Sequence, residues 1–582
     1  MAHYQLYSTP EAIREKQPLQ NQKGTCWITC DGRIDNFDEL LTALASHVSF
    51  QEAPTDGELF LAAYDTWGVE CLSRIVGDFA FALWDNEQRL LFCARDPFCM
   101  RPFFYYFDGK RFLFASQIRQ IFFDPHVPLR LNDTFIYAFL CGWSWNWEQT
   151  IYRNIRRLPG GHYLLLRSTA PIIRRYWDVD PKREIHYKDS REYDEHYRQL
   201  FRQAVHSRLR SVGPVGISLS GGVDSSVITC VANEIQRKEG IPSQGIRLFT
   251  YFYGRHRKKC DESHYASEVA QACGLSLTNI SADSFRAYEG IVQQSLSFDE
   301  PDQSAVFYKL MDALAAAAQS ENCRVLLWGH GADAFLDGSI TYLVSYLRKL
   351  KLISLARDLR RWHHYTGFTY LKLIHRYLFR PLVYPRYWME VSDNRPPWIS
   401  RKIWRKYTKM PKSKFWQPPS ITNPMVRQWY EFGLQTRRCH SWLDNQILLK
   451  HQVESRCPFF DHRLVEYLLR VPVYQKIRPG IRKFLSYRAF QDIVPKPILE
   501  RYDHINPFAF VIESLRHEWP DIRKALSSTL PYLNNYIDEQ EFLKELKRVR
   551  HGAPEQEPTA EAVVLLALWL RGIDSSCVTE RR

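Results

Sequence analysis

The stretch PVGISLSGGVDSS at residues 214–226 decides the fold prediction. Residues 214–219 form a short apolar run typical of a strand buried in a parallel sheet, and residues 225–236 carry apolar side chains at helical spacing. The turn between them contains Gly221, Gly222 and Asp224 among several serines. Glycines let the backbone approach a ligand closely, and the free amides and dipole of a helix N-terminus favour an anion. The stretch therefore predicts a strand–turn–helix unit that cradles phosphate.

The two commoner phosphate-binding motifs are absent from the sequence. A Walker loop needs GxxxxGK followed by serine or threonine, whereas the GK at 109–110 is followed by Arg111. The segment GHGADAF at 329–335 does not complete GxGxxG, because Ala334 stands at the third glycine position. A βα turn without a ligand is the plain alternative for 220–226, but such a turn needs neither Asp224 nor so many hydroxyl groups.

Strand and helix patterns continue to alternate after the turn. Strands are predicted at 247–253, 275–280 and 323–328, and helices at 261–274 and 309–319. This order is typical of a doubly wound α/β domain, in which ligands bind beyond the carboxyl ends of the strands. We therefore expect the turn and GHGAD (329–333) to lie on the same edge of one sheet.

Length and composition limit the other possibilities. The chain has 582 residues, 45% hydrophobic and 24% charged, so we expect at least two globular domains and little disorder. Its net charge of +14 favours an anionic partner. Without a helix-turn-helix, zinc-finger or RNP-like pattern, nucleic acid is not the expected partner. No segment approaches the roughly 20 apolar residues of a membrane helix, and the run at 563–570 predicts a buried C-terminal helix instead.

The N-terminus and the cysteines indicate the cellular setting. Residues 1–20 lack the basic-then-apolar order of a secretory signal, so we expect a cytoplasmic protein without membrane insertion. The 13 cysteines form no CxxC pair and show no metal-ligand spacing, which argues against a disulfide scaffold and a structural zinc site. Most of them should be reduced and buried.

Motifs over the C-terminal two thirds of the chain resemble, in their order, those of the asparagine synthetase family. They are LSGGVDSS (219–226), FTYFY (249–253), CDESHYASEVA (260–270), DEP (299–301), GHGAD (329–333), ESRCPFFDHRLVEY (454–467) and GIRKFLSYRAFQDIVPKPILERY (480–502). The resemblance implies a PP-loop ATP pyrophosphatase that forms amides. Such an enzyme joins a carboxylate to AMP, releases pyrophosphate, and lets an amine attack the acyl-adenylate.

The resemblance also implies roles for individual residues. The expected ATP-binding residues are Leu219, Ser220, Gly221, Gly222, Asp224, Ser225 and Gly329. Asp224 and Asp333 would hold Mg²⁺, and Lys483 matches the family's catalytic lysine, which stabilises charge at the reacting carboxyl group. Ala334 stands where many members have a glutamate, so the metal ligands are not the standard set.

His330 departs from the family pattern, in which other branches carry an acidic residue or tyrosine at this position. We expect His330 to take the proton of the attacking amine, with Glu454 orienting it as the acid of a dyad. The alternative is a purely structural histidine.

Residues 1–170 resemble the glutaminase half of the same family, an Ntn-type β-sandwich. The matching segments are CDGRIDN (30–36), TDGELFLAAYDTWG (55–68), GDFAFALWD (77–85), ARDPFCMRPFFYY (94–106) and FASQI (114–118). The DG pair at 108–109 predicts a hairpin.

The catalytic cysteine of the glutaminase half has no counterpart at the start of this sequence. The family uses an N-terminal cysteine whose own amine is the base, whereas this chain begins Met1-Ala2-His3. The family's opening strands also have no counterpart before residue 30, and Cys26 and Cys30 cannot expose an α-amino group. We expect either a truncated domain without glutaminase activity or a sequence whose true start lies upstream. The polar residues retained at the family's glutamine site, expected here to be structural, are Asp31, Arg33 and Asp56.

Among branches that lack the cysteine, the chain resembles lasso-peptide cyclases more than β-lactam synthetases. The segments concerned are TPEAIREKQPLQ (9–20), DGRIDNFDELL (31–41), HSRLRSVGPVGISLSGG (206–222) and GHGADAFLDG (329–338). This resemblance implies a leader-free core peptide as substrate, whose N-terminal amine is joined to an Asp or Glu side chain. It also implies a leader peptidase and a leader-binding protein as partners. The alternatives are an asparagine synthetase fed by ammonia or glutamine, and an inactive ATP-binding regulator.

We therefore expect a degenerate glutaminase-like domain at 1–170, a linker at 171–190 and a PP-loop domain at 191–582. Residues 339–440 of the last domain form a long segment rich in basic and aromatic residues. Apolar spacing in its first part predicts amphipathic helices with a solvated basic face, and the functional interpretation is a peptide-binding cap.

Overall fold

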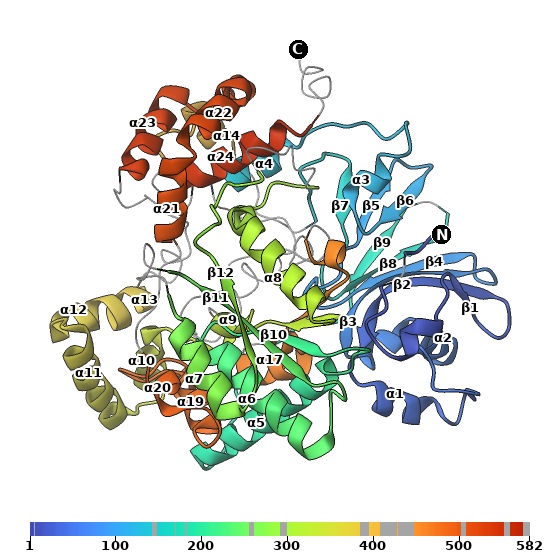
Figure 1. Cartoon of the computed structure of the whole chain (residues 1–582), viewed down its shortest axis with the longest axis horizontal. Helices are drawn as coiled ribbons and strands as arrows, with labels where there is room; N and C mark the ends of the chain where they lie inside the picture. Colours follow the sequence, from blue (N-terminus) through green and yellow to red (C-terminus); the bar gives the residue numbers. More distant parts are fainter. Residues whose placement is uncertain are drawn as a thin grey trace.

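The computed structural model describes residues 1–4, 6–141, 148–168, 170–180, 183–254, 261–291, 299–383, 395–407, 428, 447–501, 508–551 and 559–573. A β-rich N-terminal part lies beside a C-terminal part that is built around a parallel sheet (Figure 1). A layer of helices near the C-terminus contacts both parts.

The N-terminal part consists of two antiparallel sheets. The larger has the order β1-β2-β3-β4-β8-β9, with β1 Leu19–Gln20, β2 Cys26–Ile34, β3 Gly77–Asp85, β4 Leu90–Arg95, β8 His162–Leu166 and β9 Ile172–Arg175. The smaller has the order β6-β5-β7, with β5 Phe104–Phe107, β6 Phe112–Ala115 and β7 Ile155–Arg157. β5 and β6 form the hairpin predicted at 108–109, where Gly109 adopts φ +95°. The predicted β-rich sandwich is thus confirmed.

Short helices complete this part: η1 Glu11–Arg14, α1 Phe37–Leu44, α2 Asp56–Trp67, η2 Gly68–Ser73, α3 Ile118–Ile121 and α4 Asp133–Leu140. Helix α2 packs against β2 and begins with a capping box, in which the side chains of Thr55 and Glu58 each accept the other's backbone N–H. Strand β9 lies within the segment expected to be a linker. The linker expected to begin at residue 171 therefore begins later, because β9 pairs with β8 and extends the larger sheet.

The central sheet of the C-terminal part is wholly parallel, with the order β12-β11-β10-β13-β14. Its strands are β10 Val215–Ser218, β11 Ile246–Phe252, β12 Leu277–Ser281, β13 Val325–Leu327 and β14 Glu454–Arg456. Ile217, Leu248 and Val325 are fully buried, as expected for strands covered by helices on both faces. The predicted doubly wound α/β domain is confirmed.

Helices flank this sheet (Figure 1). They are α5 Ser190–Arg208, α6 Val223–Glu239, α7 Ser263–Cys273, η4 Gln303–Phe307, α8 Tyr308–Ser320, α9 Ala332–Leu336, η7 Leu448–His451, η8 Pro458–Phe460, α17 His462–Arg470, α18 Val473–Lys476, α19 Phe484–Phe490 and α20 Lys496–Leu499. Helix α6 packs between α5 and α7, while α8 packs against β11 and β12.

The segment at 339–440 begins as predicted with helices: η5 Ile340–Tyr342, α10 Leu343–Arg348, α11 Leu352–Thr366, α12 Tyr370–Ile374, the π-helix η6 His375–Phe379, α13 Arg380–Val383 and α14 Arg401–Tyr407. Residues 384–394, 408–427 and 429–440 lie outside the described part. Helices α11 and α12 project at the outer edge of the molecule (Figure 1).

The C-terminal layer contains α21 Phe508–His517, α22 Trp519–Leu533, α23 Glu539–Arg550 and α24 Thr559–Leu570. Helix α24 includes the run at 563–570, which is buried as predicted. Its core is continuous with that of the smaller N-terminal sheet and α4. None of the described helices is long and apolar enough to span a membrane.

Candidate active site

The predicted phosphate cradle is the turn between β10 and α6. The N–H of Ser220 donates to the hydroxyl of Ser225 at 3.1 Å, and the hydroxyl of Ser226 donates to the carbonyl of Gly222 at 2.8 Å. Gly222 is the N-cap of α6, and its geometry includes no side-chain cap. The first amides of a 17-residue helix therefore face a possible anionic ligand rather than a capping side chain.

Leu219 contributes to the cradle differently from its neighbours. Its side chain is fully buried and its N–H donates to the carbonyl of Phe249 at 2.8 Å. The side chain therefore fixes the end of β10 in the core and cannot itself contact a nucleotide.

Gly221 is required by the backbone of the turn. It adopts φ +78°, and a Cβ at this position would lie 2.7 Å from the Cβ of Tyr265. At Gly222, by contrast, φ is −77° and the nearest atom to a Cβ would be the hydroxyl oxygen of Ser220, at 3.4 Å.

Gly221→Ala should therefore lower the free energy of unfolding by about 1–3 kcal/mol, because it adds both a left-handed backbone and a steric overlap. Gly222→Ala is the matched control and should cost clearly less. Chemical unfolding of the two variants without nucleotide checks this prediction. Equal losses at the two glycines would contradict it.

The loop GHGAD lies against the cradle, as predicted. A Cβ at Gly329 would be 3.2 Å from both the Cβ of Asp224 and the backbone nitrogen of Ser225. The strands that precede the two loops, β13 and β10, are hydrogen-bonded neighbours. The two loops therefore pack closely at Gly329, and Asp333 lies at the same edge of the sheet as Asp224.

Lys483 lies between these two carboxylates. Its Nζ contacts an oxygen of Asp224 and lies 2.7 Å from Oδ1 of Asp333. Burial opposes the ammonium charge, but Asp224, Asp333 and Asp337 outweigh it and raise the pKa of Lys483, so that the side chain stays protonated. Lys483 itself adopts the left-handed φ of +49° at the N-cap of α19, a conformation that costs a non-glycine residue energy. The fold thus holds one strained cation at the edge of the phosphate turn.

The same two carboxylates fit a magnesium ion. Oδ1 of Asp224 is buried without a hydrogen-bond partner, and burial raises the pKa of Asp224 to about 6 against the opposing charge of Lys483. A second cation beside this oxygen would stabilise the ionised carboxylate of Asp224. Mg²⁺ typically takes one or two carboxylates and completes its coordination with water and phosphate oxygens.

His330 lies beside this group of charges. Its ring meets the Trp328 ring edge to face at a centroid distance of 5.3 Å. Burial lowers the pKa of His330 although the charge of Asp333 partly opposes this effect, so the imidazole is neutral at pH 7. A neutral imidazole near the phosphate turn can accept a proton.

Glu454 does not orient His330, and the dyad predicted from the sequence is wrong. Glu454 begins β14 and pairs in register with Val325, whereas His330 follows the far end of β13. The Glu454 carboxylate accepts from Arg33 at 2.9 Å, from Arg456 at 2.8 Å and from Arg101. These arginines satisfy both oxygens, so Glu454 belongs to a buried ionic cluster between the two domains.

That cluster also accounts for two of the polar residues in the segments that resemble the family's glutamine site. Arg33 is buried and donates to Asp35 at 2.7 Å and to Asp78 at 2.8 Å, in addition to Glu454. Asp56 accepts from Arg210 at 2.6 Å and from the N–H of Ile34 at 2.8 Å. Both are structural, as expected. Asp31 lies 3.5 Å from Arg101 and is partly exposed.

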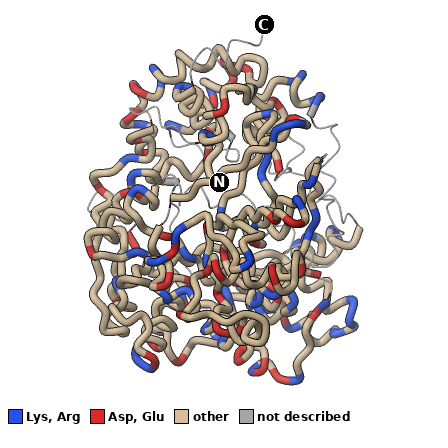
Figure 2. The backbone as a smooth tube through the Cα atoms, turned by 90° about the vertical axis from the view of Figure 1, so that its right-hand side faces the viewer, with Lys and Arg blue, Asp and Glu red and all other residues tan. Residues whose placement is uncertain are grey.

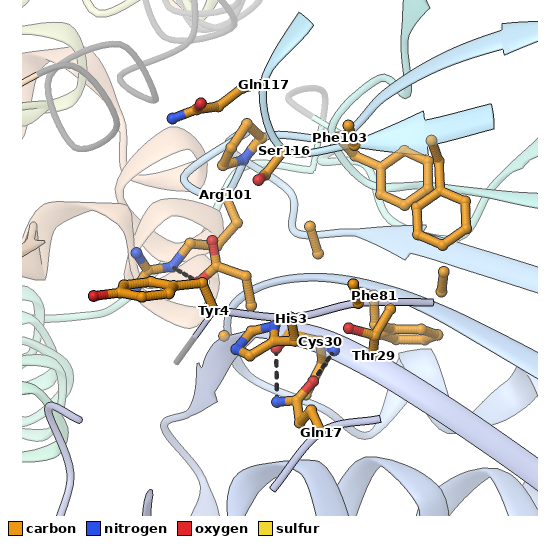
Figure 3. A pocket seen from close by; sticks show the side chains of 18 of the residues that line it. His3, Tyr4, Gln17, Thr29, Cys30, Phe81, Arg101, Phe103, Ser116 and Gln117 are labelled. Carbon is orange, nitrogen blue, oxygen red and sulfur yellow. Dashed lines mark hydrogen bonds and ion pairs between the residues drawn. The ribbon is translucent and has the colours of Figure 1, made fainter. Parts of the chain in front are cut away.

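A cavity of about 630 Å³ lies between the two N-terminal sheets (Figure 3). Phe81, Phe103 and Phe114 line its apolar part, and His3 and Arg101 are among the polar residues near its edge. Cys30 also lines it, but burial raises the pKa of the Cys30 thiol well above its usual range. All ten cysteines that the structure describes are buried.

Several residues near the candidate active site were not predicted from the sequence. Arg501 donates to the carbonyl of Gly221 at 3.3 Å and pairs with Glu262. Arg482 pairs with Asp337 at 2.5 Å and lies 3.8 Å from Asp333. Both arginines lie within the motif at 480–502, and their place in that motif is the only sequence feature that could have identified them.

A buried clamp holds the helix that carries Asp333. The side-chain amide of Gln428 donates to the carbonyls of Ala334 at 3.2 Å and Phe335 at 2.6 Å, at the end of α9. Lys476 contacts the other side of Gln428 and donates to the carbonyl of Leu468 at 2.8 Å. Nothing in the local sequence identifies this clamp, because its members are distant along the chain.

Comparisons with known proteins agree with this arrangement. A family model described as asparagine synthase matches residues 196–571, and one described as a glutamine amidotransferase domain matches residues 1–177. The chain is 26% identical over 83% of its length to asparagine synthetase (glutamine-hydrolyzing) 2 of Bacillus subtilis, and 25% identical over 84% to asparagine synthetase (glutamine-hydrolyzing) 3 of that organism. It spans 62% of the length of the first relative and 76% of the second.

A third relative is a putative asparagine synthetase (glutamine-hydrolyzing) of Mycobacterium bovis, 27% identical over 81% of this chain and 73% of its own length. The fold and the phosphate edge define an ATP-dependent carbon–nitrogen ligase of the amide-forming class. The asparagine synthase model covers more than half of the length of this chain, so the chain belongs to the asparagine synthase family.

Proposed function

We propose that this protein forms an amide by activating a carboxylate as its AMP ester, and that its substrate is a peptide that it closes into a macrolactam. The observation that carries the proposal is the position of Lys483 between Asp224 and Asp333, at the edge of the phosphate turn. The buried cysteines of the glutaminase-like domain support an amine other than glutamine-derived ammonia.

The first half-reaction uses the phosphate turn. The substrate carboxylate attacks the α-phosphorus of ATP, and the bond to pyrophosphate breaks. The amides at the start of α6 and the hydroxyls of Ser220 and Ser225 would hold the leaving pyrophosphate. Asp224 and Asp333 would hold Mg²⁺, which neutralises phosphate charge when bound. Lys483 provides a fixed cation at the same edge, where negative charge develops.

The second half-reaction joins the amine to the activated acyl group. The amine nitrogen attacks the acyl carbon, AMP leaves with the electrons of the acyl–phosphate bond, and the amine loses a proton. His330 would accept that proton, and its lowered pKa, which leaves the imidazole neutral, supports this role. Together the two steps remove one water from the substrate and convert ATP to AMP and pyrophosphate.

Ring closure is energetically within reach of such a site. Closing a ring of about eight residues costs only about 2 kcal/mol of chain entropy. Holding the amine and acyl carbon in attack geometry can supply roughly 7–11 kcal/mol. The harder requirement is a surface that holds the rest of the peptide. A leader peptidase and a leader-binding protein would supply the leader-free substrate.

Asparagine synthesis from free ammonia is the second candidate, favoured by the names of the relatives. It uses the same first half-reaction, with aspartate as the carboxylate. An inactive ATP-binding regulator is the third, but a protein that only binds ATP gains nothing from the strained conformation of Lys483.

The decisive experiment is mass spectrometry of products after incubation with ATP and Mg²⁺. One sample contains a synthetic peptide with a free N-terminal amine and an Asp or Glu about eight residues along the chain. The other contains aspartate and ammonium. We expect a peptide lighter by one water, with one AMP per ring. His330→Gln should slow ring formation by about 10²-fold while ATP–pyrophosphate exchange continues.

The possible outcomes separate the three candidates. Asparagine without cyclic peptide would assign the second function. Exchange of pyrophosphate without either product would leave the ligase class in place and reject both substrates. No peptide- or aspartate-dependent AMP, together with ATP binding, would favour the regulator.

A further inference from the structure

The helices at residues 343–383, here called the basic arm, expose an unusual amount of apolar surface. Of the 19 exposed large hydrophobic side chains in the described part of the chain, ten lie between residues 350 and 383. They are Leu350, Leu352, Ile353, Tyr365, Tyr370, Leu371, Ile374, Phe379, Leu382 and Val383. Singly exposed apolar residues are ordinary, but this concentration within one projecting arm marks an interaction surface.

The arm does not need these residues for its own folding. A separate set of apolar side chains faces inward, including Leu343, Leu355, Trp362 and Leu373, and packs against Val473 of α18. The arm is therefore held on the body by one apolar side and presents further apolar side chains to solvent.

The exposed apolar surface is accompanied by positive charge. Residues 343–383 contain nine lysines and arginines and one acidic residue, Asp358. Asp358 is fully buried, accepts from the hydroxyl of Tyr342 at 2.8 Å and lies 3.6 Å from Arg478. Outside the arm, Glu184 pairs with Lys349 at 2.7 Å. The exposed part of the arm thus presents no carboxylate of its own, whereas acidic and basic residues are mixed on the face with the N-terminal domain (Figure 2).

We infer that the basic arm binds the surface of an anionic lipid bilayer. Helices that combine exposed Leu, Ile and Phe with many Lys and Arg lie in the boundary between lipid headgroups and acyl chains. The basic side chains then meet anionic headgroups, each contributing about 1 kcal/mol near the surface, and Tyr365 and Tyr370 suit the same depth. An acidic peptide would match only the positive charge of the arm. An anionic bilayer matches that charge and also the exposed aliphatic side chains, which are spread along the arm. The arm lies at the outer edge of the molecule, where a flat surface can reach it (Figure 1).

Sedimentation with lipid vesicles tests this inference without any ligase assay. We expect the full-length protein to sediment with vesicles of phosphatidylcholine and phosphatidylglycerol, and to stay in the supernatant with phosphatidylcholine alone. Raising the salt to about 0.5 M should weaken the binding, because screening shortens the reach of the charges. Binding to pure phosphatidylcholine at the same level would overturn the role assigned to charge.

Substitutions localise the effect to the arm. Ile353 and Leu371 are 86% and 81% exposed, so replacing both with aspartate should leave the fold intact and weaken vesicle binding at least about tenfold. Phe123→Asp is the matched control, since Phe123 is 83% exposed and lies in the N-terminal domain. Circular dichroism verifies that both variants are folded.

Three results would refute the proposal. One is the absence of sedimentation with any vesicle. The second is unchanged binding of the Ile353→Asp, Leu371→Asp variant. The third is binding of a glutamate-rich peptide by a protein that ignores vesicles, which would make the arm a protein-docking surface.

Discussion

Lys483→Ala is expected to lower the rate of carboxylate-dependent AMP formation by about 10²–10³-fold, the usual cost of removing a fixed charge-stabilising group. In the wild type the ammonium contacts both Asp224 and Asp333 at the edge of the phosphate turn. Its loss removes the cation from the position where phosphate and acyl oxygens gain charge. ATP–pyrophosphate exchange in the presence of substrate measures the effect on the first half-reaction directly.

Lys496→Ala is the matched control, because Lys496 lies on α20, is 75% exposed at its side chain and pairs only loosely with Glu500 at 3.5 Å. It should exchange pyrophosphate at the wild-type rate. Thermal unfolding of both variants separates a catalytic loss from a folding loss. A Lys483→Ala enzyme that stays folded and retains more than about a tenth of the exchange rate would show that Lys483 is not needed for activation of the carboxylate.

Glu454→Gln should have the largest effect on stability, about 3–5 kcal/mol at neutral pH, because it leaves buried arginines without their counter-ion. Burial disfavours the Glu454 carboxylate, but the charges of Arg456, Arg101 and Arg33 outweigh it and hold the pKa of Glu454 well below its usual range. The group therefore stabilises the fold fully above the unfolded-state pKa of about 4.3. That contribution is lost as the pH falls towards the folded-state pKa.

Urea unfolding of wild type and Glu454→Gln between neutral and acidic pH measures both effects. We expect the two unfolding midpoints to differ most at neutral pH and to converge in acid. Glu500→Gln, at a position 48% exposed at its side chain, is the control and should unfold like the wild type. If Glu454→Gln instead unfolds normally and loses only amide formation, the catalytic role predicted from the sequence would return.

Local features of the candidate active site could be predicted from the sequence, and long-range ones could not. The phosphate turn follows from neighbouring residues: a buried strand, two glycines and a helix start. The contact between the phosphate turn and Gly329 could also be predicted, because the carboxyl ends of parallel strands lie on one edge of the sheet. Glu454 was misplaced because its partner Arg33 is 421 residues away, and no spacing rule connects them.

The same distinction applies to the rest of the molecule. Helices were predicted after residue 339 from their periodicity, but the exposed side of α11 and α12 depends on how the arm docks against α18. The contact of Gln428 with α9 could not be predicted from the local sequence, because the two are far apart along the chain. The interpretation of 339–440 as a peptide-binding cap remains a prediction, and much of that segment lies outside the described residues.

The hydrophobic core that joins the smaller N-terminal sheet to the C-terminal helices means that the two halves of the chain depend on each other for stability. Side chains from α4, such as Ile136 and Leu140, share one interior with Leu566 and Trp569 of α24. Deleting the N-terminal domain would therefore expose the apolar side chains of α24 that pack against it, and an exposed patch of this kind favours aggregation. The N-terminal domain thus has a structural role towards the C-terminal helices, whatever reaction it carries out itself.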